Sequence, residues 1–134
     1  MPKIEQKKIP NDVSVEFAGR TMTQACHNNA WNAGWWHDIN TGEVKERNVP
    51  EALCLIHSEV SEALEGFRKG VYDDHLTDRP MLEVELADAV IRIFDLAGGM
   101  KLDVAGAIAE KLEYNRKRAD HKVENRKKDG GKKV

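Results

Sequence analysis

Apolar residues recur at helical spacing in four segments of the chain, and no segment shows the strict alternation that is typical of a strand. The first segment begins near Ser14 and runs through "SVEFAGRTMTQACHNNAWNAGWW". The second runs from Pro50 to about Lys69, the third is "MLEVELADAVIRIFDLAGG", and the fourth is "VAGAIAEKLEYNRKRA" after Asp103. Pro50, Gly70 and Asp103 stand where helices start and stop. The pattern predicts an all-α fold of four helices joined by short loops.

The distribution of polar residues predicts three parts of the chain. Residues 1–13 are polar, contain two prolines and form an N-terminal arm. Residues 14–119 form the helical domain, and residues 120–134 form a basic C-terminal tail. One to two of the three tryptophans are expected to pack in the core, because burial is the usual fate of Trp.

Composition limits the class of protein. The 134 residues carry a net charge of −2, but the nine Lys or Arg after residue 115 leave an acidic body with twelve basic and twenty acidic residues. An acidic body disfavours binding to nucleic acid. No run approaches the roughly 20 apolar residues of a membrane span, and the N-terminus lacks an apolar signal segment. Cys26 and Cys54 are expected to be reduced thiols of a cytoplasmic protein, in the host cytoplasm if the protein is viral.

Two of the predicted helices place carboxylates beside their apolar surface. Glu59 and Glu62 lie at the edge of the apolar arc of the second helix, and residues three apart share a helix face. Glu85 and Asp88 repeat this spacing in the third helix, whose remaining surface is almost entirely apolar. Helices this apolar are mostly buried, so the acidic stripe is expected to face an enclosed space.

Four carboxylates brought together repel one another and resist losing water unless a cation compensates them. Mg²⁺ and Mn²⁺ prefer oxygen ligands and keep positions open for water and phosphate. No Glu-x-x-His spacing completes a di-iron set. The residues therefore favour metal-assisted phosphate chemistry at Glu59, Glu62, Glu85 and Asp88, and the alternative is two ordinary solvated acidic faces.

The order of the motifs resembles one family. "SEVSE" followed by "EVELAD" is similar to the Glu-x-x-Glu and Glu-x-x-Asp signature of the MazG-like, all-α nucleoside triphosphate pyrophosphohydrolases. "NAGWW", "DDHLTDRP" and "KLEYNRKR" resemble further blocks of the small single-domain subgroup. The resemblance covers roughly residues 15–133, and it is the ordered combination of blocks that makes it specific.

The resemblance implies a four-helix bundle-like fold that assembles as a homodimer or homotetramer. It implies hydrolysis of an NTP or dNTP to the monophosphate and pyrophosphate. The four carboxylates would then be both the catalytic residues and the ligands of Mg²⁺ or Mn²⁺. The ions would neutralise the triphosphate and lower the pKa of an attacking water.

The resemblance also implies substrate contacts outside the carboxylates. Lys111, Asn115 and Arg118 match the family's Lys-x-x-x-Asn block and are expected to hold phosphate and sugar. Asn32 and Trp35 are expected at the base or ribose, with Trp35 stacking. Arg79, in the loop before the third helix, is the sixth candidate, for phosphate.

Several alternatives remain open from the sequence. A wide pocket walled by tryptophan favours a purine deoxynucleotide such as dGTP, and the role is control of the nucleotide pool. A second possibility is a helical module that binds nucleotide or protein without hydrolysis. A third is nucleic-acid binding through the basic tail, which predicts salt-sensitive binding.

Overall fold

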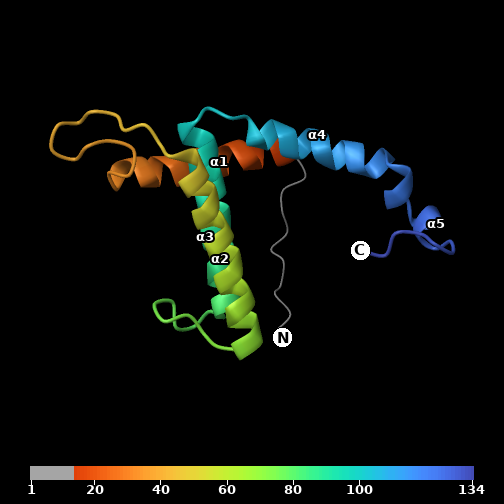
Figure 1. The fold of residues 1–134 in the computed structure, drawn as a ribbon. Coiled ribbons are helices and arrows are strands. Elements are labelled where there is room, and N and C mark those ends of the chain that lie inside the picture. The colour runs from red at the N-terminus through yellow and green to blue at the C-terminus, as the bar shows by residue number, and fades with distance from the viewer. Residues whose placement is uncertain (1–13) are drawn as a thin grey trace. The chain divides into compact units, whose positions relative to one another are not determined.

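The computed structural model describes residues 14–134, and within them the chain is all-helical, without strands. The helices, shown in Figure 1, are α1 (Val15–Asn32), α2 (Val49–Lys69), α3 (Met81–Gly99), α4 (Val104–Lys117), the 3₁₀ turn η1 (Ala119–His121) and α5 (Val123–Arg126). The all-α prediction is confirmed, with one short helix more than predicted. In the described range no helix is both long and apolar enough to cross a membrane. The predicted arm at residues 1–13 lies outside the described residues.

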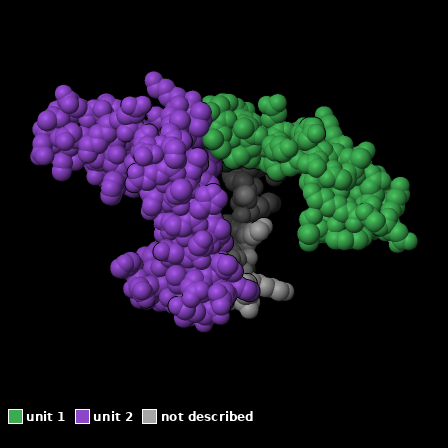
Figure 2. Space-filling view, viewed as in Figure 1, with its two compact units in different colours: residues 1–21, 103–134 green, residues 22–102 purple. Residues whose placement is uncertain are grey.

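The chain divides into two compact units, coloured separately in Figure 2. One unit spans residues 22–102 and holds the last part of α1, the loop after it, α2 and α3. The described part of the other unit comprises residues 14–21 and 103–134, which hold the start of α1, α4, η1 and α5. The predicted boundary between residues 119 and 120 falls inside this second unit. Within it, Arg126 donates hydrogen bonds to the backbone carbonyls of Lys132 and Lys133.

Local chemistry sets the ends of the helices. The side chain of Asn48 accepts a hydrogen bond from the backbone N–H of Glu51 and caps α2, while Gly70 ends α2 in the left-handed conformation. Asp103 caps α4 by accepting from the N–H of Gly106. The prediction that the first helix reaches Trp36 was wrong: α1 ends at Asn32, because Gly34 turns the chain with a φ of 84°.

α2 and α3 form an antiparallel hairpin, visible in Figure 1 as the yellow-green helix beside the green-cyan one. The buried positions of the two helices are mostly small or acidic: Ala52, Glu59, Ala63 and Gly66 in α2, and Glu85, Ala89, Asp95, Leu96 and Ala97 in α3. A Cβ added to Gly66 would lie 2.8 Å from the Cγ of Met81. The helices therefore approach closely, with little room for large side chains between them.

Many of the large apolar residues of the hairpin are exposed. In α2 they include Leu53, Val60, Leu64 and Phe67, and in α3 they include Leu86, Val90, Ile91 and Ile93. Phe67 is 64% exposed and Leu64 58% exposed. The expectation that the apolar surface of the third helix is buried was therefore wrong for the single chain. The acidic stripe and the small residues occupy the inner side, so the large residues face outward.

Trp36 anchors the core of the larger unit. Its indole packs with Ala52 and Leu96, and its Nε1–H donates to Oδ1 of the buried Asp95 at 2.8 Å. Trp36 is 5% exposed, whereas Trp31 and Trp35 are exposed. The expected burial of one or two tryptophans is thus met by one.

The close packing of the hairpin predicts a sharp sensitivity to side-chain volume. Ala63 is 2% exposed, so Ala63→Leu should lower the free energy of unfolding by about 1–3 kcal/mol through overpacking. Ala25→Leu, the same change at an exposed position of α1, should alter it by less than about 0.5 kcal/mol. Urea denaturation of both variants measures the difference. Equal effects at the two positions would contradict the close approach of α2 and α3.

Candidate metal centre

Three of the four predicted carboxylates come together between α2 and α3. One carboxylate oxygen each of Glu59, Glu85 and Asp88 lies within 4.8 Å of the others. Glu59 and Glu85 are buried and Asp88 is half-buried. The spacing of three residues in α3 turns Glu85 and Asp88 to one side of that helix, and Glu59 meets them from α2.

Glu62 does not join this group. It is exposed on α2, although its negative charge is close enough to raise the pKa of Glu85. The predicted set of four is therefore arranged as three clustered carboxylates and one that acts on them from a greater distance. We call Glu59, Glu85 and Asp88 the carboxylate cluster.

The carboxylate cluster is electrostatically strained when no metal is bound. The pKa of Glu85 is raised to about 7, first by burial and then by the charge of Glu62, a hydrogen bond with Glu59 and the charges of Glu59 and Asp88. Burial also raises the pKa of Asp88, and the charge of Glu59 adds to this, while Arg92 opposes it. Below about pH 7 Glu85 therefore tends to keep its proton, which lowers the negative charge of the cluster.

One cation contacts the carboxylate cluster directly. The Nε–H of Arg92, in α3, donates to Oε1 of Glu59 at 2.6 Å and so ties α3 to α2. The sequence motifs assigned Arg92 no role. Its pairing could not have been deduced from spacing, because Glu59 lies 33 residues away in another helix.

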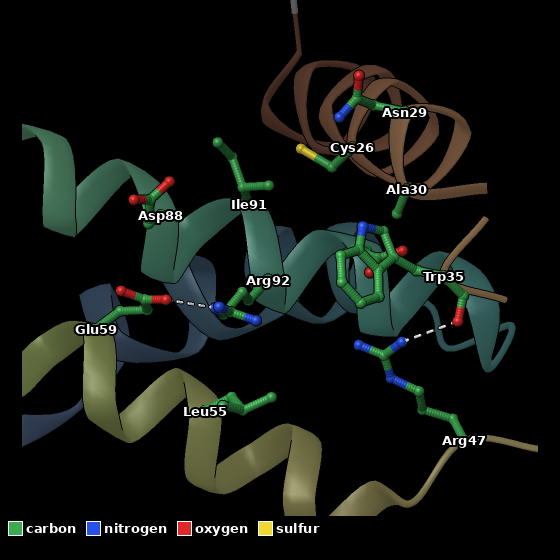
Figure 3. A pocket seen from close by; sticks show the side chains of 11 residues that line it. Cys26, Asn29, Ala30, Trp35, Arg47, Leu55, Glu59, Asp88, Ile91 and Arg92 are labelled. Atoms are coloured by element: carbon green, nitrogen blue, oxygen red, sulfur yellow. Dashed lines mark hydrogen bonds and ion pairs between the residues drawn. The ribbon is translucent and has the colours of Figure 1, made fainter. Parts of the chain in front are cut away.

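A pocket of about 400 Å³ adjoins the carboxylate cluster (Figure 3). Residues of α1, the loop after it, α2 and α3 line it, among them Asn29, Trp35, Arg47, Glu59, Arg92 and Asp95. Its side chains thus include an exposed indole, two guanidinium groups and the carboxylates of the cluster's edge. This combination suits a ligand with both a flat ring and negative charge.

Hydrogen bonds hold the buried Trp36 and the backbone of the pocket residue Trp35. Oδ1 of Asp95 accepts from Trp36 and lies 3.0 Å from Nδ1 of His27. The guanidinium of Arg47 donates to the carbonyl of Trp35 at 3.3 Å and lies 5.0 Å from the ring centre of Trp36. Trp35 is 67% exposed and lines the pocket.

Two of the other predicted substrate contacts of this unit lie away from the pocket lining. Asn32 is exposed at the last position of α1 and is not among the lining residues. Arg79 is exposed and pairs with Glu83, one turn into α3. In the same loop Asp73 accepts from the backbone N–H groups of His75 and Leu76, which fixes the turn and lowers the pKa of Asp73.

Lys111, Asn115 and Arg118 belong to the other unit. The Nζ of Lys111 lies 4.6 Å from the ring centre of Tyr114, and Oδ1 of Asn115 is buried without a partner among the described residues. Because α4 ends at Lys117, Arg118 follows in extended backbone, where its guanidinium binds both carboxylate oxygens of Asp120. Their assignment to substrate remains a prediction.

No family model, curated protein or solved structure matches this chain. The resemblance to the MazG-like enzymes therefore rests on the sequence motifs alone. The structural features that bear on function are the carboxylate cluster and the pocket beside it.

The raised pKa of Glu85 predicts that the metal-free protein loses stability as pH rises. Between about pH 4.5 and 7 the unfolded chain gives up this proton while the folded chain keeps it, so the folded state binds more protons and its stability falls. Thermal denaturation in EDTA should show a falling midpoint over this range. In Glu85→Gln the fall should be smaller, whereas Glu110→Gln, on α4, should match the wild type.

A divalent cation reverses this trend if it binds the carboxylate cluster, because it replaces the proton and binds only the folded state. With excess Mn²⁺ the midpoint at pH 7 should rise in the wild type and less in Glu85→Gln. A midpoint that rises with pH in EDTA would contradict the arrangement of the carboxylates.

Proposed function

We propose that the chain is a metal-dependent nucleotide pyrophosphohydrolase of the MazG-like type, which cleaves an NTP or dNTP to the monophosphate and pyrophosphate. The observation that carries the proposal is the inward position of three carboxylates, two of them buried, from two helices. Buried acids without full compensation are costly, so a functional use explains their presence better than stability does.

The carboxylate cluster suits Mg²⁺ or Mn²⁺ by the chemistry of its donors. The group contains oxygen ligands from Glu59, Glu85 and Asp88 and no sulfur or imidazole. A bound ion would supply neutralisation of the triphosphate charge and a water of lowered pKa. Glu62 is near enough to add its negative charge to the attraction of the ion. Attack of the water on the α-phosphorus would then release pyrophosphate.

The pocket beside the cluster suits the remainder of a nucleotide. Trp35 offers an exposed ring for stacking on the base, and the guanidinium groups of Arg47 and Arg92 line the same space. We infer a purine deoxynucleotide such as dGTP, in keeping with a wide indole-walled pocket. Separately from this pocket, the sequence resemblance assigns phosphate and sugar binding to Lys111, Asn115 and Arg118. It also assigns a role in control of the nucleotide pool.

We further propose that the chain works as a homodimer or homotetramer. The support is the outward row of large apolar residues on α2 and α3, which includes Leu64 and Phe67. Burying each such side chain contributes about 1.5–3 kcal/mol. A second copy covering this row would complete the bundle that one hairpin leaves open.

Product analysis tests the reaction. The eight common NTPs and dNTPs are incubated with Mg²⁺ or Mn²⁺, and the products are separated by ion-pair chromatography. We expect monophosphate plus pyrophosphate, with kcat/KM reduced at least about 100-fold in Glu59→Gln and Asp88→Asn. Glu65→Gln, an exposed neighbour on α2 paired with Lys69, should retain wild-type activity.

Two results would contradict this proposal. Diphosphate plus orthophosphate would mean that the wrong bond has been assigned. Intact triphosphates with folded protein and both metals would favour a binding module without hydrolysis.

Assembly is tested separately by light scattering after size-exclusion chromatography. The double variant Leu64→Glu with Phe67→Glu should reduce a dimeric or tetrameric wild type to monomer, because two charges would have to be buried in the interface. Ser58→Glu, which adds one charge at an exposed position of α2 about 120° around the helix from Leu64, should leave the mass unchanged. A monomeric wild type would contradict the proposed assembly.

A further inference from the structure

Arg92 lies at the border between the carboxylate cluster and the pocket (Figure 3). Its Nε–H is bonded to Glu59, whose side chain is 10% exposed, while the Arg92 side chain is 39% exposed. The two Nη nitrogens have no partner among the described residues. The Nη–H donors of Arg92 are therefore available to a ligand in the pocket, while its Nε–H binds the carboxylate cluster.

The second guanidinium of the pocket is already committed. Arg47 donates to the carbonyl of Trp35 and lies over the Trp36 ring. Arg47 thereby holds the backbone of Trp35 and packs on the buried Trp36, so moving it would disturb both residues. Arg92, with one bond to a carboxylate that is itself a candidate metal ligand, is the group whose partner can change.

A divalent ion and Arg92 compete for Glu59. Both are cations that bind the same carboxylate. Once Glu59 is no longer paired with the guanidinium, its full negative charge is available to the ion, so the ion binds it more strongly. Once released, the planar fork of Arg92 matches two oxygens of a phosphate. A phosphate in this pocket would lie beside Glu59 and Asp88, which line it too.

We propose that Arg92 exchanges partners during binding: it holds Glu59 in the metal-free protein, and it binds substrate phosphate once a divalent cation has taken Glu59. This rests on the proposed function and adds to it a phosphate-binding residue and an order of events.

The competing explanation is that Arg92 only holds Glu59 in position. The two explanations predict opposite effects on metal affinity. If Arg92 positions Glu59 for the ion, its removal weakens metal binding. If Arg92 competes with the ion, its removal strengthens metal binding. The reason is that the ion binds only molecules in which Glu59 is unpaired, so pairing with Arg92 lowers the apparent affinity of the ion.

The first measurement is Mn²⁺ affinity without nucleotide, by calorimetry, with melting curves to confirm folding. Arg92→Met keeps the length of the side chain and should bind Mn²⁺ about tenfold more tightly than wild type. Arg92→Lys, which keeps the charge, should lie within about threefold of wild type. Arg68→Met, which removes an exposed cation from an ion pair of α2, is the matched control and should be unchanged.

The second measurement is the affinity for inorganic pyrophosphate at saturating Mg²⁺, which probes the phosphate site independently of the base. It should fall at least about tenfold in Arg92→Met and less in Arg92→Lys, because lysine keeps a charge but not the fork. Tighter Mn²⁺ binding together with weaker pyrophosphate binding is the expected signature, and a purely positioning role does not produce it.

Each other outcome has a definite meaning. Weaker Mn²⁺ binding in Arg92→Met, or pyrophosphate binding equal to that of wild type, would overturn the role of Arg92 and leave the metal centre intact. Absence of Mn²⁺ binding in both wild type and Arg92→Met would overturn the metal centre and the exchange together.

Discussion

The meeting of Glu59 and Glu85 in the interior of the α2–α3 hairpin is the constraint on which the rest of this unit depends. Two acids placed at less than one-tenth exposure, with Asp88 beside them, cannot all be ionised without a cation. The hairpin accommodates them by packing through alanine and glycine. Because the inner side is given to small and acidic residues, the large apolar side chains have only the outer side left.

The inner side of the hairpin therefore needs positive charge, and the outer side needs apolar contacts. The inner side lacks positive charge, which Arg92 and a proton on Glu85 supply in the absence of metal. The outer side lacks apolar cover, which residues 14–134 do not supply for side chains such as Phe67. A divalent ion would meet the first need and a second copy of the chain the second, so metal binding and assembly are expected to stabilise the same two helices.

Much of the local structure was predictable from sequence, including the inward direction of the acidic stripe, but the exposure of the large apolar residues was not. Pro50 and Gly70 marked the second helix, and the structure places α2 at Val49–Lys69. The three-residue spacing correctly grouped Glu85 with Asp88. Periodicity shows that a helix has an apolar arc and a polar stripe, yet it does not say which one meets the neighbouring helix.

Contacts between distant segments account for the remaining misses. Arg92 with Glu59, and Asp95 with Trp36 and His27, join residues 33 to 68 positions apart, and no local pattern encodes such pairs. A crystal grown with Mn²⁺ and measured at a wavelength with a manganese anomalous signal tests the central claim most directly. We expect an anomalous peak among Glu59, Glu85 and Asp88. A fully ordered carboxylate cluster without a peak, with Arg92 still bound to Glu59, would contradict it.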